Sequence, residues 1–285
     1  SYPVIEATFQ EASDALGYDL WALVQNDTDG KLNETHVTQP ALLTASVAIW
    51  RVIREQGLEV SYLAGHSLGE YSALVAAGAL NLADAVKTVR KRGTYMQEAV
   101  AVGVGAMAAI IGSDLATIEE GCEEAAQGQI CSPANINSPK QIVIAGNAEA
   151  IDRACEILKE KGARKAIKLN VSAPFHCDLM QPAQDRLADA LNEINFSDLQ
   201  FPIFENVTAD ENFQGKRVSK ALTQQVSSPV RWLQTIEKLI AKDVETFVEV
   251  GAGKVLSGLV RQINRNPQCF NAEDRESLSN TLSNL

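Results

Sequence analysis

Hydrophobic and polar positions follow one another along the chain in blocks that predict helices and short buried strands. Residues 40–57 repeat apolar side chains at helical spacing, with Pro40 in the first turn, which predicts a long helix. Residues 60–64 (VSYLA) are apolar and partly β-branched, as is typical of a buried strand. Residues 70–80 and 84–99 follow as a helix of small residues and an amphipathic helix. The first third of the chain is therefore predicted to be α/β.

The pattern changes after residue 102. Residues 103–172 predict a strand, an acidic helix, two strands joined by an Asn/Ser/Pro turn, a helix and a strand. This βαββαβ order is the pattern of a ferredoxin-like unit, here inserted into the chain. Residues 173–251 then return to alternating helices and strands, and a helix at 253–263 precedes a polar tail at 264–285.

Residues 65–69 read Gly-His-Ser-Leu-Gly and fit the motif G-x-S-x-G, with a predicted strand before and a helix after. A serine at such a sharp turn has strained backbone angles, and glycines on both sides remove a collision between side chains. The helix N-terminus directs free N–H groups at the serine, so the N–H of Leu68 can stabilise an oxyanion. Ser67 is predicted to be a nucleophile; the alternative is an N-cap serine in a tight turn.

A serine nucleophile needs a base, and the sequence has three histidines. His66 adjoins Ser67, but neighbouring side chains diverge here, so we expect a local structural or substrate-contacting role. His36 lies in a polar segment predicted to be a solvated loop. His176 follows a strand and a Pro-containing turn, where α/β folds place chemistry, and is predicted to be the base. No acid is marked by its spacing, so a backbone or amide carbonyl could orient the imidazole instead, which suits a thioester substrate.

Composition and charge narrow the class of protein. The chain is 46% hydrophobic and 21% charged, and no apolar run approaches the ~18–20 residues that span a bilayer. The net charge of −11 argues against nucleic-acid binding. Five cysteines without a C-x-x-C pair indicate reduced thiols. We therefore expect a cytoplasmic protein with neither a nucleic-acid nor a membrane partner. We also expect the protein to be a monomer.

Six stretches in order resemble the malonyl-CoA:acyl-carrier-protein transacylase family of bacterial fatty-acid synthesis. They are AGHSLGEYSALVAAGAL, KRGTYMQEAV, GAMAAIIG, ANINSPKQIVIAG, VSAPFHC and VEVGAGKVLSGL, and the resemblance covers essentially the whole chain. It implies an α/β fold: an α/β-hydrolase-like core with a mostly parallel sheet at residues 1–102 and 173–285. The ferredoxin-like small domain would be residues 103–172. The family begins with a strand and a Gly-Gln-Gly-Ser-Gln segment that supplies a second oxyanion N–H, and we expect this chain to start after it.

The resemblance assigns roles to individual residues. It implies that Ser67 accepts the acyl group, that His176 is base and acid, and that the backbone carbonyl of Gln225 orients this histidine. Arg92, one charge in a cluster predicted to be solvated, matches the arginine that binds the malonyl carboxylate, which a guanidinium can hold bidentately. Further positions that match residues of the family near the cleft are Asn135, Asn137 and Gln39, and His66 is the remaining candidate for a substrate contact.

The implied reaction is a two-step transfer. Ser67 takes the malonyl group from malonyl-CoA and passes it to the phosphopantetheine thiol of acyl carrier protein. Coenzyme A enters as the substrate thioester, and no metal or cofactor is needed. The carrier is expected to dock on a basic patch, either Lys87, Arg90 and Lys91 or Arg164, Lys165 and Lys168. The alternatives are a serine hydrolase or thioesterase, with water as acceptor, and an inactive binding or scaffold protein.

Overall fold

Three long helices of the first third of the chain pack against one another. In the computed structural model, which describes residues 2–171 and 173–285, they are α1 (Pro3–Leu16), α3 (Thr35–Glu55) and α5 (Leu82–Glu98). Two short elements, α2 (Leu20–Gln25) and η1 (Lys31–Asn33), lie between the first two. The apolar faces of the three long helices contribute to the largest hydrophobic cluster of the described residues, together with α4 and later segments of the chain. Ser1 and Ser172, which bound two of the predicted domain segments, lie outside the described residues.

The long helix predicted at 40–57 begins earlier than expected. It starts at Thr35, so Pro40 lies inside it, and His36 is on its first turn rather than in a solvated loop. The extra turn packs directly on α5, because a Cβ at Gly93 would lie 2.6 Å from the His36 Cα. The predicted start of the helix was therefore wrong. The backbone of the first turn packs on Gly93, and this contact stabilises a helical turn before Pro40.

Short parallel strands build the centre of the larger unit. β1 (Leu63–Ala64) pairs in parallel with β6 (Ile203–Phe204), which pairs antiparallel with β7 (Glu211–Asn212). A second, two-stranded parallel sheet joins β8 (Thr246–Val250) to β9 (Gln268–Ala272). The strand predicted at 60–64 is thus cut to its last two residues, because β1 and β6 pair only over two residues each.

Residues 105–168 form a separate four-stranded antiparallel sheet with two helices. The elements are β2 (Gly105–Ile111), α6 (Leu115–Ala126), β3 (Cys131–Ser138), β4 (Gln141–Asn147), α7 (Ala148–Glu160) and β5 (Lys165–Lys168). The predicted βαββαβ order is confirmed, and the spatial order is β3-β4-β2-β5. Along β2 the side chains alternate: Ala108 and Ile110 pack under α6 and α7, whereas Met107 faces the opposite cluster with Cys177.

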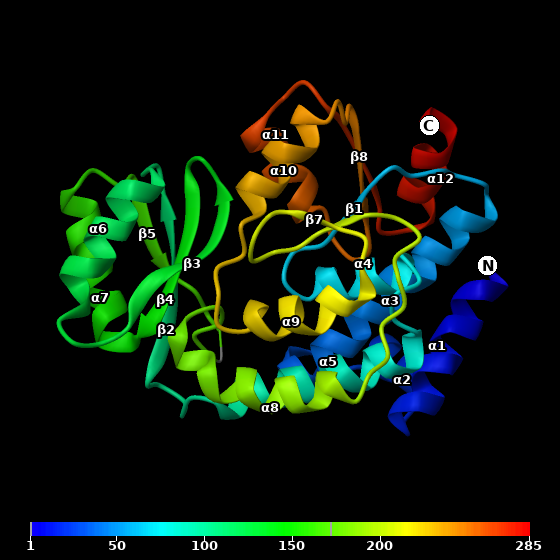
Figure 1. Ribbon diagram of the computed structural model, residues 1–285, viewed down its shortest axis with the longest axis horizontal. Helices are drawn as coiled ribbons and strands as arrows, with labels where there is room; N and C mark the ends of the chain where they lie inside the picture. The colour runs from blue at the N-terminus through cyan, green and yellow to red at the C-terminus, as the bar shows by residue number, and fades with distance from the viewer. Residues whose placement is uncertain (1, 172) are drawn as a thin grey trace.

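This smaller unit lies beside the larger one in Figure 1, where it is drawn in green. A parallel bridge joins Asn135 of β3 to Val230, just before α10 (Trp232–Ala241), and the Ile136 N–H donates to the Val230 carbonyl at 2.9 Å. The chain returns to the larger unit through η2 (Asp178–Met180), α8 (Gln181–Asn192) and α9 (Gly215–Gln225). Among the described residues, no helix combines the length and the apolar character that crossing a bilayer requires.

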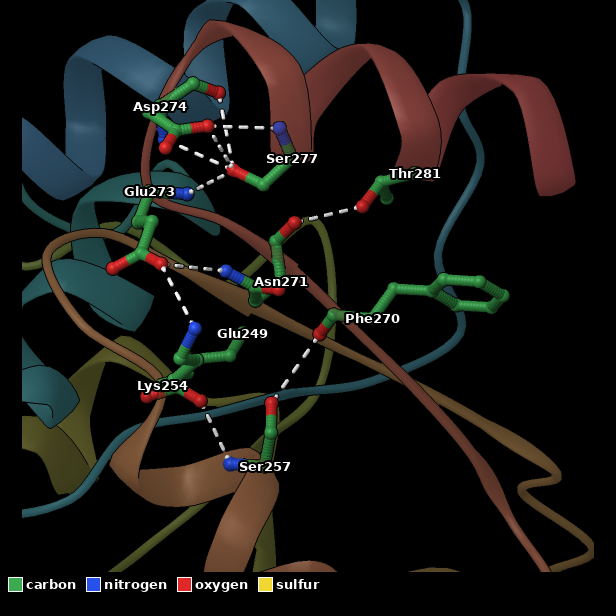
Figure 2. A network of polar contacts seen from close by, with 9 residues as sticks. All are labelled: Glu249, Lys254, Ser257, Phe270, Asn271, Glu273, Asp274, Ser277 and Thr281. Atoms are coloured by element: carbon green, nitrogen blue, oxygen red, sulfur yellow. Dashed lines mark hydrogen bonds and ion pairs between the residues drawn. The ribbon is translucent and has the colours of Figure 1, made fainter.

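The predicted polar tail at 264–285 is wrong, because these residues form β9 and α12 (Arg275–Asn284) after α11 (Val255–Ile263). Figure 2 shows the polar contacts that hold them. Asp274 and Ser277 form a capping box, and the Thr281 hydroxyl donates to the Asn271 carbonyl at 2.8 Å. The Glu249 carboxylate of β8 accepts the Ser257 N–H at 2.7 Å and so caps α11. The polar sequence of residues 264–285 predicted a tail, but hydrogen bonds from their side chains hold them in a strand and a helix.

Candidate active site

Ser67 lies in a sharp turn between β1 and α4 (Gly69–Ala76), with a positive φ of 52°. A Cβ at Gly65 would lie 1.9 Å from the Gly69 carbonyl carbon, so only glycine fits there. A Cβ at Gly69 would meet nothing within 4 Å. The predicted strain is confirmed, but the need for two glycines is only half right: the collision is between a side chain at 65 and the backbone at 69. Within residues 2–171 and 173–285, no hydrogen bond uses the Leu68 N–H, which leaves this donor free.

His176 completes the predicted pair. Its Nε2 lies 2.8 Å from the Ser67 Oγ, and its Nδ1 lies 2.8 Å from the Gln225 backbone oxygen. A carbonyl oxygen can only accept, so Nδ1 carries the proton and Nε2 is free to accept the serine proton. Burial, followed by the nearby Arg92 charge, lowers the pKa of His176 to about 3. The imidazole is therefore neutral at physiological pH.

Arg92 is buried beside the nucleophile rather than in a solvated cluster, with only 2% of its surface exposed. Its Nη2 donates to the Ser67 Oγ and to the Gln225 Oε1, both at 3.0 Å. Its Nη1 donates to the Gln39 Oε1 at 2.7 Å. Among the described residues its Nε has no hydrogen-bond partner. The site thus holds a guanidinium with hydrogen-bonding capacity to spare.

His66 and Asn137 form a second group next to this one. The His66 Nε2 lies 2.8 Å from the Asn137 Oδ1, and its ring tilts against Trp232 with centroids 5.6 Å apart. Since an amide oxygen accepts, Nε2 is the donor, and burial lowers the pKa of this histidine. Asn135 lies in the bridge to Val230. The structure therefore gathers Ser67, His176, Arg92, Gln225 and Gln39 at one point, with His66, Asn137 and Asn135 toward the smaller unit.

Two residues of the site were missed by the sequence interpretation. The Asn206 Oδ1 accepts the Ser67 N–H, and its Nδ2 donates to the Gly65 carbonyl, both at 2.7 Å. Glu70 accepts from the Gln225 amide at 2.7 Å. Burial raises the pKa of Glu70 to about 7. An acidic residue in a first helical turn ordinarily complements the helix dipole, so the sequence did not mark Glu70 as a site residue. Asn206 follows a strand that was predicted from its apolar residues alone, so the sequence did not mark this polar residue either.

A cavity of about 820 Å³ reaches the turn, and His176 is not among its lining residues. It lies between β1 and β8, and near the turn it is lined by Gly65, His66, Leu68 and Asn137. Ser67 itself does not line this cavity. Leu68, which follows the nucleophile in the chain, is therefore also a lining residue of this cavity.

The fold and the paired serine and histidine define an acyl-transferring protein: residues 4–277 match the model of the acyl transferase domain family. The malonyl CoA-acyl carrier protein transacylase of Escherichia coli (strain K12) is 53% identical over 264 residues, covering 92% of this chain and 85% of that protein. The transacylase structure from Coxiella burnetii superposes with a TM-score of 0.97 at 46% identity, covering 100% of this chain and 90% of the other. The structure of a type II PKS acyl-carrier protein in complex with its malonyl-transacylase gives a TM-score of 0.97 at 49% identity, covering 100% of this chain and 92% of the other. The chain belongs to the malonyl CoA-acyl carrier protein transacylase family.

Proposed function

We propose that the chain transfers a malonyl group from coenzyme A to the phosphopantetheine thiol of acyl carrier protein, through a malonyl ester on Ser67. One observation carries this proposal: the Ser67 Oγ lies 2.8 Å from the His176 Nε2 and 3.0 Å from the buried Arg92 Nη2. The nucleophile thus touches both a neutral base and a cation that suits a carboxylate. The names of the relatives, which act on malonyl-CoA and acyl carrier protein, support the same substrates.

In the first step, the His176 Nε2 takes the Ser67 proton while Oγ attacks the thioester carbonyl. The free N–H of Leu68 stabilises the developing oxyanion. The C–S bond then breaks, and His176 returns the proton to the coenzyme A sulfur. In the second step, the carrier thiol gives its proton to His176 and its sulfur attacks the carbonyl of the Ser67 ester. The C–Oγ bond then breaks, and His176 returns the proton to Oγ, which restores the serine hydroxyl.

Arg92 would select the acyl group. A charge-assisted pair contributes about 1.5–3 kcal/mol, which corresponds to about a 10- to 150-fold preference for malonyl over acetyl. The same pair would also strengthen the base. The Arg92 charge lowers the pKa of His176, so a bound carboxylate that offsets this charge raises the pKa of the imidazole again.

The finer architecture is part of the proposal. We assign an α/β-hydrolase-like core to residues 1–102 and 173–285 and a ferredoxin-like small domain to 103–172. The strand order β3-β4-β2-β5, with α6 and α7 packed on one face, supports the second assignment. The five cysteines, which are all free thiols, support a cytoplasmic location. We also propose that the chain acts as a monomer.

Two basic patches are candidates for the docking surface of the carrier, one on α5 and one on the smaller unit. In the patch of the smaller unit, Lys168 is paired with Asp152 at 2.7 Å. In the patch on α5, Arg90 donates to the Leu16 carbonyl and stacks on Tyr18. Lys87 and Lys91 line a small surface cavity beside Arg90 on this helix, which also carries Arg92. Since Lys87 and Lys91 lie on the helix that reaches the site, we propose the α5 patch as the docking surface.

Malonyl-CoA labelled in the malonyl group tests the function. After mixing with the chain, intact mass should show a malonyl adduct that is absent in Ser67→Ala, and added holo-carrier should remove it with the label. Release of free malonate, with no label on the carrier, would identify a hydrolase instead. Failure to form any adduct would indicate a non-catalytic protein.

A further inference from the structure

Glu70 is a buried carboxyl group that the two transfer steps do not use. It lies in the first turn of α4, and only 1% of its surface is exposed. Its Oε2 accepts hydrogen bonds from the Gln225 Nε2 at 2.7 Å and from the Asn206 N–H at 3.1 Å. A carboxyl group is costly to bury, and these two hydrogen bonds offset part of that cost. The role of Glu70 therefore depends on what Gln225 and Asn206 do.

Both partners of Glu70 also hold the nucleophile turn. The Gln225 Nε2 donates to the Ser67 carbonyl at 2.9 Å, and the Gln225 carbonyl is the acceptor for His176. The Asn206 side chain accepts the Ser67 N–H and donates to the Gly65 carbonyl. Since Asn206 follows β6 and Gln225 ends α9, Glu70 joins three separate segments at one carboxylate oxygen.

The carboxyl group and the Ser67 carbonyl together set which way the Gln225 amide points. An ionised carboxylate only accepts, so the Gln225 NH₂ group must face Glu70. The Gln225 Oε1 is then directed at Arg92, from which it accepts at 3.0 Å. The opposite orientation would bring two oxygens together at Glu70 and direct the amide NH₂ at the guanidinium.

We propose that Glu70 is a positioning residue for acyl transfer, which holds Gln225 and Asn206 and through them the Ser67 turn and the carbonyl that orients His176. Glu70 makes no hydrogen bond to the Ser67 Oγ or to the His176 ring within the described residues. The identity of the acyl group rests on the proposed function, whereas the effect of Glu70 on the reactivity of Ser67 does not.

The charged groups around Glu70 make its role depend on pH. Arg92 on α5 favours the ionised form, Glu205 after β6 opposes it, and burial is the largest influence, raising the pKa of Glu70 to about 7. A charge-assisted hydrogen bond is about twice as strong as a neutral one. Protonation of Glu70 below pH 7 should therefore loosen Gln225 and Asn206. His176, with its pKa near 3, stays neutral over this range.

The test uses two reagents on the full chain. Phenylmethanesulfonyl fluoride reports on Ser67 alone: its sulfur bonds to Oγ, the S–F bond breaks, fluoride leaves and His176 takes the proton. Malonyl-CoA reports on the proposed reaction.

The variants are Glu70→Ala, which removes the carboxyl group, and Glu70→Gln, which keeps an acceptor oxygen. The matched control is Glu205→Gln, a carboxyl that is 4% exposed and bonds Arg217 at 3.0 Å. Rates come from intact mass between pH 5.5 and 8.5.

With both reagents, Glu70→Ala should slow modification of Ser67 by up to about 100-fold. Glu70→Gln should be about fivefold slower than wild type at pH 8 and independent of pH, matching wild type at pH 6. Half-saturation by malonyl-CoA should change less than about threefold, because Glu70 does not contact the substrate. Glu205→Gln should keep a pH-dependent rate, with its midpoint moved slightly to lower pH, because a charge that raises the Glu70 pKa is removed. Should Glu70→Ala fail to fold, the pH profile of Glu70→Gln decides.

Three results would overturn the role of Glu70: wild-type rates in Glu70→Ala, no change of the pH profile in Glu70→Gln, or equal slowing in Glu205→Gln. A wild-type chain that reacts with the sulfonyl fluoride but not with malonyl-CoA contradicts the proposed function, while the sulfonyl fluoride rates still decide the role of Glu70. A wild-type chain that reacts with neither reagent overturns both proposals.

Discussion

Arg92 shows how far one side chain can depart from its sequence context. It follows Lys87, Arg90 and Lys91 on an amphipathic helix, yet it is buried and directed at Ser67. Burying a guanidinium lowers its pKa and costs free energy, which three side-chain acceptors offset here: Gln39, Gln225 and Ser67. A cation placed at this cost is suited to bind an anion.

Replacing Arg92 tests this selectivity. In Arg92→Ala, the ratio of the acylation rates with malonyl-CoA and acetyl-CoA should fall about 10- to 150-fold, because a charge-assisted pair of about 1.5–3 kcal/mol is lost. Single-turnover acylation of Ser67, followed by intact mass, measures both rates. Arg90→Ala, an exposed arginine on the same helix, should leave the ratio unchanged. An unaltered ratio in Arg92→Ala would remove Arg92 from substrate selection.

Glu70 and His176 should contribute to stability with opposite signs as pH changes. The folded pKa of Glu70 is raised from 4.5 to about 7, so its contribution is full below pH 4.5 and is lost as pH rises through 7. The folded pKa of His176 is lowered from 6.5 to about 3, so its contribution is lost as pH falls below 6.5. Between about pH 4.5 and 6.5 the two slopes oppose each other.

The Glu70→Gln variant should separate these contributions. As pH falls from 7 to 4.5, wild type gains stability by protonating Glu70, and the variant does not. The free energy of unfolding of the variant minus that of wild type should therefore decrease by about 1.4 kcal/mol per pH unit. Urea unfolding at several pH values measures this difference. Parallel pH dependences for the two proteins would contradict a raised Glu70 pKa.

At the scale of elements, the strand–turn–helix around Ser67 was predictable because its constraint is local. Two glycines, a short apolar strand and a helix of small residues stand together in the sequence. The actual strand is only two residues long, and only Gly65 is required by packing. The C-terminal β9 and α12 were missed because β9 is held by its pairing with β8 in another segment. α12 is held by a cap, formed by Asp274 and Ser277, in a stretch of mostly polar residues.

Gly65 and Gly69 should therefore respond differently to substitution. Gly65→Ala forces a Cβ to 1.9 Å from the Gly69 backbone and should cost about 3 kcal/mol or more, with loss of Ser67 reactivity. Gly69→Ala meets nothing within 4 Å and should leave stability within about 1 kcal/mol of wild type. Thermal unfolding and labelling by sulfonyl fluoride report both effects. Equal losses in the two variants would show that the turn requires both glycines.

At the scale of the whole molecule, the site depends on the contact between the two units. His66 of the larger unit donates to Asn137 of β3, and the bridge between Asn135 and Val230 lies nearby. Figure 1 shows β3 at the edge of the smaller unit that faces the larger one. The inserted unit therefore forms one wall of the region around the nucleophile.

Asn137→Ala should weaken this contact. The His66 N–H would lose its acceptor in a buried position, which costs about 1–3 kcal/mol of unfolding free energy. Chemical denaturation measures the loss. Ser132→Ala is the comparison, since this serine lies on the same strand β3 and its side chain makes no hydrogen bond among the described residues. If Asn137→Ala is as stable as wild type, the His66 contact does not join the two units.

The sequence determined what short-range chemistry can specify: the element order of the inserted unit, the turn at Ser67, and a histidine after the return of the chain. It did not determine that Arg92 is buried, that Glu70 and Asn206 brace the turn, or that the last residues form a strand and a helix. The hydrogen bonds of Glu70 join segments 136 and 155 residues apart, and those of Arg92 join residues 25 to 133 apart. The last residues depend on the pairing of β9 with β8. Only the tertiary structure brings such residues together, because burial and hydrogen-bond partners are properties of the packed chain.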